Sequence, residues 1–103
     1  MLDYLNNYNI SNEQIAIIEK NIKEKGVNID IFKYAPEKII SILNLFKSIG
    51  VTNFYNIIIT NPSMFRDTIT SIKNRINKYP NKNELAKLLD EDITNLSLVG
   101  LLY

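Results

Sequence analysis

The strongest candidates for a functional site are basic side chains in the middle of the chain. Lys and Arg neutralise phosphate groups, and a surface that gathers several of them binds nucleic acid in a salt-dependent way. Residues 38–82 carry seven Lys or Arg against a single acid and have a net charge of +6. Residues 1–37 have a net charge of −2, and residues 83–103 have one of −3. The predicted nucleic-acid contacts are Lys47, Arg66, Lys73, Arg75, Lys78 and Lys82.

These cations must be brought together by the elements that carry them. On a helix over 67–78 with its isoleucines facing inward, Arg75 and Lys78 point to one side and Lys73 to the other, so this helix alone gives no single basic stripe. Tyr55 and Tyr79 could stack on bases or lie beside phosphates, although half-buried tyrosines are common in ordinary cores. We predict a small protein that binds nucleic acid, with DNA favoured over RNA, provided that the mid-chain helices converge.

The composition argues against an enzyme. The chain has no His, Cys or Trp, which removes disulfides, thiolate zinc sites, thiol nucleophiles and the usual general base near neutral pH. The acidic run 90–92 at a helix junction is better placed to favour the next helix through its dipole than to hold a metal. The three glycines are expected at helix ends, so no loop cradles a phosphate. We expect no catalytic residue, no cofactor and no metal.

Two other interpretations concern the last twenty residues. The run 83–89 followed by 93–99 allows a helix-turn-helix, but its second helix would have no Lys or Arg, so a capped helix pair that closes the core is preferred. The apolar C-terminal residues either fold back onto the helix 36–49 or form a homodimer contact. The second case gives the alternative function, a protein-interaction or oligomerisation module. Its contact residues would be Leu96, Leu98, Val99, Leu101 and Leu102.

Helix start and stop signals run through the whole chain. Ser11 and Gln14 form a capping box, Asn81 and Glu84 form another, and Pro36 suits a first helical position. Apolar residues recur at helical spacing after each start. We therefore predict one all-α domain over residues 1–103, either a small bundle or a short helical-repeat array of five to six helices. The expected helices are 12–25, 36–49, 54–60 (capped by Thr52), 67–78, one from Lys82 through Leu89, and 93–99, with short turns at 31–34 and 62–65.

Two features of composition affect this interpretation. The helix 36–49 is apolar around most of its circumference, which predicts the central buried element. The triplet Ile57-Ile58-Ile59 also allows a strand, but its short length between two helix signals favours a helix. The chain has 18 Ile and 15 Asn, a bias typical of AT-rich coding sequence, so single Asn residues are not taken as signs of polar chemistry.

A possible repeat and a family resemblance both involve residues 31–78. Aligning Pro36 with Pro62 brings apolar residues into register with a period of 26–27 residues. The stretch 45–52, Leu-Phe-Lys-Ser-Ile-Gly-Val-Thr, followed by Ile57-Ile58 and by Asn-Pro-Ser-Met-Phe at 61–65, resembles the repeat of the mitochondrial transcription termination factor (mTERF) family. The turn Tyr-Ala-Pro-Glu-Lys-Ile at 34–39 is similar to a second such turn. The resemblance implies a helical superhelix whose inner surface binds nucleic acid. Its candidate contacts here are Lys47, Arg66, Lys73 and Arg75.

The sequence also bears on location. Its apolar stretches are only a few residues long, so no membrane span is expected. The first residues show neither a basic region nor an apolar stretch of the kind found in secretion signals. With no cysteine, these features predict a cytoplasmic protein.

Overall fold

The computed structural model describes residues 2–103, which form six α-helices and three 3₁₀-helices with no strand. The all-α class is confirmed, but the predicted number of helices is too low. The segment 30–34 is a helix rather than a turn, and the N-terminal 3₁₀-helix has no capping side chain by which the sequence could reveal it. The elements are η1 (Asp3–Tyr8), α1 (Asn12–Glu24), α2 (Asp30–Tyr34), α3 (Pro36–Ile49), α4 (Phe54–Thr60), η2 (Pro62–Arg66), α5 (Ile69–Asn77), α6 (Lys82–Glu91) and η3 (Ile93–Val99).

Capping side chains set most of the helix starts. At α1 the Ser11 hydroxyl accepts a bond from the Gln14 amide at 3.1 Å, and the Gln14 side chain accepts one from the Ser11 amide at 3.0 Å. This confirms the capping box and satisfies two amides that the helix itself leaves unpaired. Asn81 accepts a bond from the Glu84 amide at 3.1 Å, which is one of the two bonds of the predicted capping box, and Asp92 accepts one from the Thr94 amide at 3.0 Å. Pro36 stands at the first position of α3.

The start of α4 differs from the prediction. Asn53 caps this helix by accepting a bond from the Asn56 amide at 3.2 Å, whereas Thr52 bonds to the carboxylate of Asp90 on α6. The expected cap residue is therefore wrong by one position, because a contact distant in sequence engages Thr52. The helical interpretation of 57–59 is confirmed, and Ile57 and Ile58 are fully buried.

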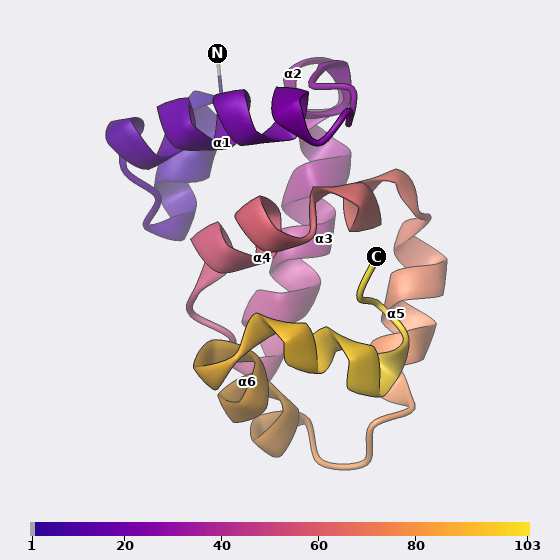
Figure 1. Cartoon of the computed structure of the whole chain (residues 1–103). Coiled ribbons are helices and arrows are strands. Elements are labelled where there is room, and N and C mark those ends of the chain that lie inside the picture. The colour runs from indigo at the N-terminus through magenta and orange to yellow at the C-terminus, as the bar shows by residue number, and fades with distance from the viewer. Residues whose placement is uncertain (1) are drawn as a thin grey trace.

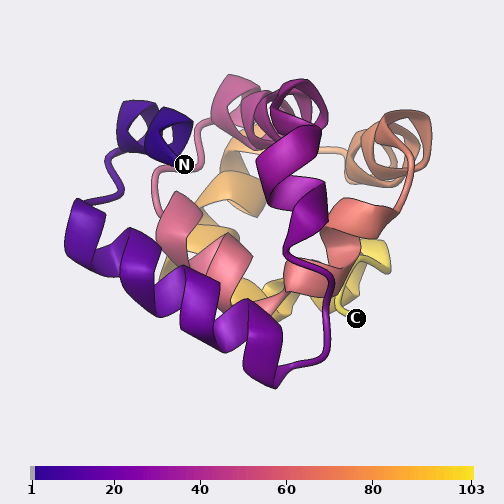
Figure 2. The ribbon, with the colours of Figure 1, turned by 90° about the horizontal axis from the view of Figure 1, so that it is seen from above.

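The helices pack around α3, which extends through the middle of the molecule (Figure 1). Helices α2, α5 and α6 contact it, while α1 packs against η1 and α4 (Figure 2) and η3 packs against α4 and α6. The molecule measures 36 × 23 × 22 Å along its principal axes. The prediction of α3 as the central element is confirmed by its fully buried residues, which are Ile39, Ile42, Leu43 and Phe46.

Two parts of the chain share the order of a short helix, a proline and a longer helix. In the first, α2 is followed by Pro36 and α3; in the second, α4 is followed by Pro62 in η2 and then by α5. This order is what the proposed repeat period reflects, although the two α-helices that follow the prolines have 14 and 9 residues. A true repeat stays a prediction.

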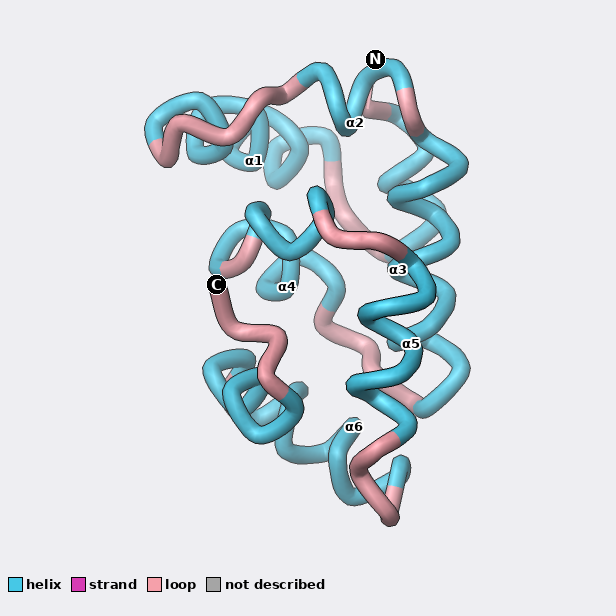
Figure 3. Tube along the Cα trace, turned by 90° about the vertical axis from the view of Figure 1, so that its right-hand side faces the viewer, coloured by secondary structure: helices cyan, strands magenta, loops and turns pink. Residues whose placement is uncertain are grey.

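The C-terminal segment folds back, but its hydrogen bonds do not go to α3. Figure 3 shows it as a loop that leaves η3 and reaches α4. There it bonds to the side chain of Asn61, the residue that ends α4. None of the helices between residues 2 and 103 combines the length and hydrophobicity needed to cross a bilayer.

Candidate nucleic-acid interface

Helix α5 sends its cations to two different sides, as its phasing predicts. Lys73 lines a small pocket of about 90 Å³ between α5 and the end of α3, together with Leu45, Ser48 and Ile49. Arg75 and Lys78 instead line a second pocket. The structure therefore brings Arg75 and Lys78 together and separates Lys73 from them.

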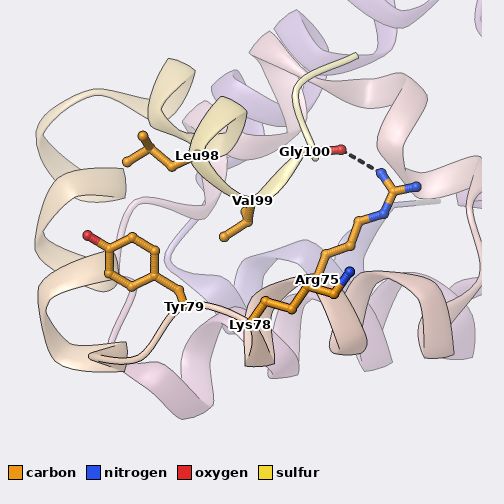
Figure 4. Close-up of a pocket in the computed structure, with 6 residues that line it drawn as sticks. All are labelled: Arg75, Lys78, Tyr79, Leu98, Val99 and Gly100. Atoms are coloured by element: carbon orange, nitrogen blue, oxygen red, sulfur yellow. Dashed lines mark hydrogen bonds between the residues drawn. The ribbon is translucent and has the colours of Figure 1, made fainter.

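The second pocket, which we call the α5–η3 cleft, is the larger of the two, with a volume of about 300 Å³. Its floor is formed by the C-terminal half of α5 and its wall by the end of η3 (Figure 4). Arg75 of α5 and Lys78, the residue that follows this helix, extend along the same side of the cleft, and the ring of Tyr79 lies across from Leu98. The cleft thus combines two cations, one aromatic ring and an apolar wall. Its lining residues are Arg75, Lys78, Tyr79, Leu98, Val99 and Gly100.

Arg75 is held in place by the C-terminal segment. Its Nη1 donates to the Gly100 carbonyl at 2.5 Å and to the Tyr103 hydroxyl at 3.2 Å, and that hydroxyl donates to the Asp67 carboxylate at 2.5 Å. The bond from Tyr103, with smaller contributions from Thr68, Ser71 and the charge of Arg75, lowers the pKa of Asp67 below its ordinary value of 3.8. The network fixes the guanidinium at the edge of the cleft.

Lys78 is the cation of the cleft whose side chain makes no hydrogen bond or ion pair with residues 2–103, and it is exposed. It follows the last residue of α5, where helix carbonyls point outward and a cation is favoured by the helix dipole. Its charge is therefore available to a ligand without loss of an internal contact.

Lys82 has an internal role. Its ammonium group donates to the Asn77 carbonyl at 3.1 Å and to the Tyr79 carbonyl. These carbonyls belong to the end of α5 and the loop after it, so Lys82 satisfies acceptors that the helix leaves open. The structure places Lys82 under this loop rather than in the lining of the cleft.

The two remaining candidates lie on other elements. The ammonium of Lys47 on α3 is 5.9 Å from the centroid of the Tyr8 ring, whose hydroxyl donates to Asn44 at 2.7 Å. Arg66 is an exposed residue at the end of η2. Neither lines one of the two pockets described above.

The acidic run at residues 90–92 is engaged in capping. The carboxylate of Asp90 accepts bonds from the Thr52 and Asn53 amides at 3.0 and 3.1 Å, and Asp92 accepts one from the Thr94 amide at 3.0 Å. Among residues 2–103 no group of three potential metal ligands comes together. The helix-turn-helix alternative is disfavoured as well, because residues 93–99 form a 3₁₀-helix and not the α-helix that would enter a groove.

The C-terminal leucines divide into buried and exposed residues. Leu96 and Leu101 are fully buried, so they belong to the core and cannot form the outer surface of a dimer contact. Leu98 and Leu102 remain 54% and 38% exposed, and Val99 is half-buried. The expected five-residue contact is therefore reduced to two exposed leucines.

Two residues with clear structural roles were not singled out by the sequence. Lys25 donates to the Ile59 and Thr60 carbonyls at 2.8 and 3.3 Å, which joins the end of α1 to the end of α4. Asn61 is the one buried polar residue in the part of the chain that the structure describes, and it holds the C-terminal segment. No local signal marks these contacts, because their partners lie 34 to 42 positions away.

Comparisons with protein-family models, with curated proteins and with solved structures found no match. The resemblance to the mTERF repeat therefore stays a prediction from the residues alone, and the function has to be argued from the α5–η3 cleft.

Proposed function

We propose that this protein binds nucleic acid without catalysis, with DNA as the first choice, and that the contact is centred on the α5–η3 cleft. The observation that supports this is the grouping of Arg75, Lys78 and the Tyr79 ring around one opening. This surface is narrower than the six-residue surface predicted from the sequence.

The cleft suits an unpaired nucleotide better than a duplex. Proteins bind single strands by pairing cations with the backbone and by stacking bases on aromatic rings, at about 1–3 kcal/mol per stacked base. The exposed ammonium of Lys78 offers a phosphate contact, and Tyr79 with the wall at Leu98 offers a place for a base. The volume of about 300 Å³ lies at the lower end of ordinary small-ligand sites, so the cleft has room for about one nucleotide and cannot enclose a double helix.

The test is the salt dependence of binding to a fluorescein-labelled oligothymidine of about 16 nucleotides, followed by fluorescence anisotropy. The variant Lys78→Gln should weaken binding and reduce the slope of log K against log salt by about one unit, because one phosphate contact is lost. Lys87→Gln is the matched control, since it removes an exposed lysine from α6, away from the cleft. Lys73→Gln reports on the opposite side of α5 and should also leave the slope unchanged.

Stacking is tested at Tyr79. Tyr79→Phe keeps the ring and should retain the affinity, whereas Tyr79→Leu should lose about tenfold, consistent with the loss of one stacked base. Duplex DNA and single-stranded RNA of the same sequence are the comparison ligands. An unchanged anisotropy for every probe at low salt would overturn the proposal.

A further inference from the structure

The last three residues, 101–103, which we call the closing segment, are held by side chains from other parts of the chain, as a separate bound peptide would be. The side-chain amide of Asn61 donates to the Leu101 carbonyl at 2.6 Å, and its oxygen accepts a bond from the Tyr103 amide at 2.9 Å. Asn61 is fully buried. One buried amide therefore makes a two-point contact with the main chain of the segment, and such a contact does not depend on how the segment is connected to the rest of the chain.

Side chains add selectivity to this main-chain contact. Leu101 is fully buried, whereas the Tyr103 ring is half exposed and only its hydroxyl is engaged, with Asp67 and Arg75. Asn61, Asp67 and Arg75, which we call the Asn61 site, thus bind an extended segment that has a leucine followed two positions later by a tyrosine.

Gly100 joins this segment to η3 and has the backbone freedom of a hinge. Its φ is +69°, a conformation that residues with a side chain rarely adopt, and its amide bonds to the Ser97 carbonyl at 3.2 Å. A change of torsion angles at this residue redirects Leu101–Tyr103 and leaves the body of η3 in place. Releasing Leu101–Tyr103 would break its bonds to the Asn61 site and the bond from the Leu101 amide to the Leu96 carbonyl.

We propose that the Asn61 site also accepts Leu101–Tyr103 from a second copy of this chain, so that two copies exchange their closing segments. Each copy then regains every contact that it gives up to the Asn61 site, and such exchange is a low-cost route to a two-fold dimer. Leu98 and Leu102, on either side of the hinge, are 54% and 38% exposed in the single chain. A dimer built around two crossing segments covers these leucines, which supplies apolar burial that the monomer lacks.

Exchange is tested with two complementary full-length variants. Leu101→Ala has an intact Asn61 site and a defective closing segment, whereas Asn61→Ala has an intact segment and a defective site. A short tether gives its segment an effective concentration of about 1 mM at its own site, so the two variants are mixed near that concentration. The intact segment of one variant should then bind the intact site of the other. One variant is labelled uniformly with ¹⁵N, so that native mass spectrometry separates the two by mass. It should show a heterodimer, and the mixture should melt at a higher temperature than either variant alone.

Other results of the mixing experiment overturn the proposal. A mixture that contains only the two separate species, with melting curves equal to their sum, shows that the segment acts only within its own chain. If Leu101→Ala alone forms dimers to the same extent as the mixture, the chains associate without exchanging segments.

A second variant keeps the proposal testable if either of these fails to fold. Gly100→Ala disfavours the closed hinge through its φ alone, because an added Cβ would meet only Arg75 Nη1 at 3.9 Å. The dimerisation constant measured by sedimentation should rise by about tenfold or more relative to the wild type. An unchanged or lower constant overturns the proposal. Fluorescence anisotropy measures binding at the cleft and sedimentation measures association, so failure of nucleic-acid binding and failure of segment exchange are distinguishable.

Discussion

The hydroxyl of Tyr103 connects an acid from the η2–α5 junction with a base from α5. It donates to Asp67 and accepts from Arg75, so the carboxylate is stabilised in its charged form by a neutral donor and by a nearby cation. The same neighbourhood raises the pKa of Tyr103, first through desolvation, then through the hydrogen bond to Asp67 and the charge of that carboxylate. The phenol is therefore protonated, and able to donate, throughout the neutral range in which Asp67 is charged.

This network predicts a pH dependence of stability. Because the folded-state pKa of Asp67 is lowered, its contribution is present above the ordinary value of 3.8 and is lost as pH falls through the lower folded value. The free energy of unfolding in urea should therefore drop more between about pH 6 and pH 3 for the wild type than for Asp67→Asn. Tyr103→Phe removes the largest cause of the shift and should fall between them. Identical drops in all three proteins would contradict the assignment.

Asp90 gives a second prediction at the level of one residue. Its carboxylate accepts bonds from two amides and one hydroxyl in the segment before α4, so it acts as a cap supplied from another helix. Asp90→Ala should reduce the free energy of unfolding by about 1–2 kcal/mol, as the loss of an ordinary N-cap does. Glu91→Ala, its exposed neighbour, should stay within about 0.5 kcal/mol. Equal losses measured by urea denaturation would show that the acidic run acts only through its total charge.

Among the elements, α3 and α5 show what local sequence can predict. The bounds of α3 agree with the predicted 36–49, since a proline at the first turn and a glycine after the last are local signals. The division of cations around α5 is predicted as well, because it follows from helical periodicity alone. The role of Lys82 was also open to prediction, because lysines just beyond a helix end often bind its last carbonyls.

Glycines at the helix ends give a prediction for elements. Gly50 follows α3 with a φ of +110°, and Gly26 lies beyond α1 with a φ of +72°. An added Cβ would meet Ala86 at 3.5 Å at the first position and nothing within 4 Å at the second. Gly26→Ala should cost about 1 kcal/mol and Gly50→Ala about 2 kcal/mol or more, because +110° lies further from the left-handed region open to alanine. Equal losses in urea denaturation would contradict this order.

At the scale of the whole molecule, the unpredicted features are contacts between distant parts of the chain. Asn61 was discounted because asparagine is abundant, yet it is the buried residue that holds the closing segment. Arg75 is predicted as a nucleic-acid contact, and the sequence gives no sign that its guanidinium also bonds to residues 25 and 28 positions away. Helix bounds depend on neighbours within a few positions, whereas these partners depend on how the helices pack, which hydrophobic periodicity does not specify.

Arg75 belongs both to the wall of the α5–η3 cleft and to the network that retains Tyr103. A phosphate that draws the guanidinium away from the Gly100 carbonyl raises the population of the released conformation, and release in turn raises the affinity for the phosphate by the same factor, since thermodynamic linkage is reciprocal. An oligonucleotide bound in this way would increase the fraction of molecules whose C-terminal residues are available to a second copy.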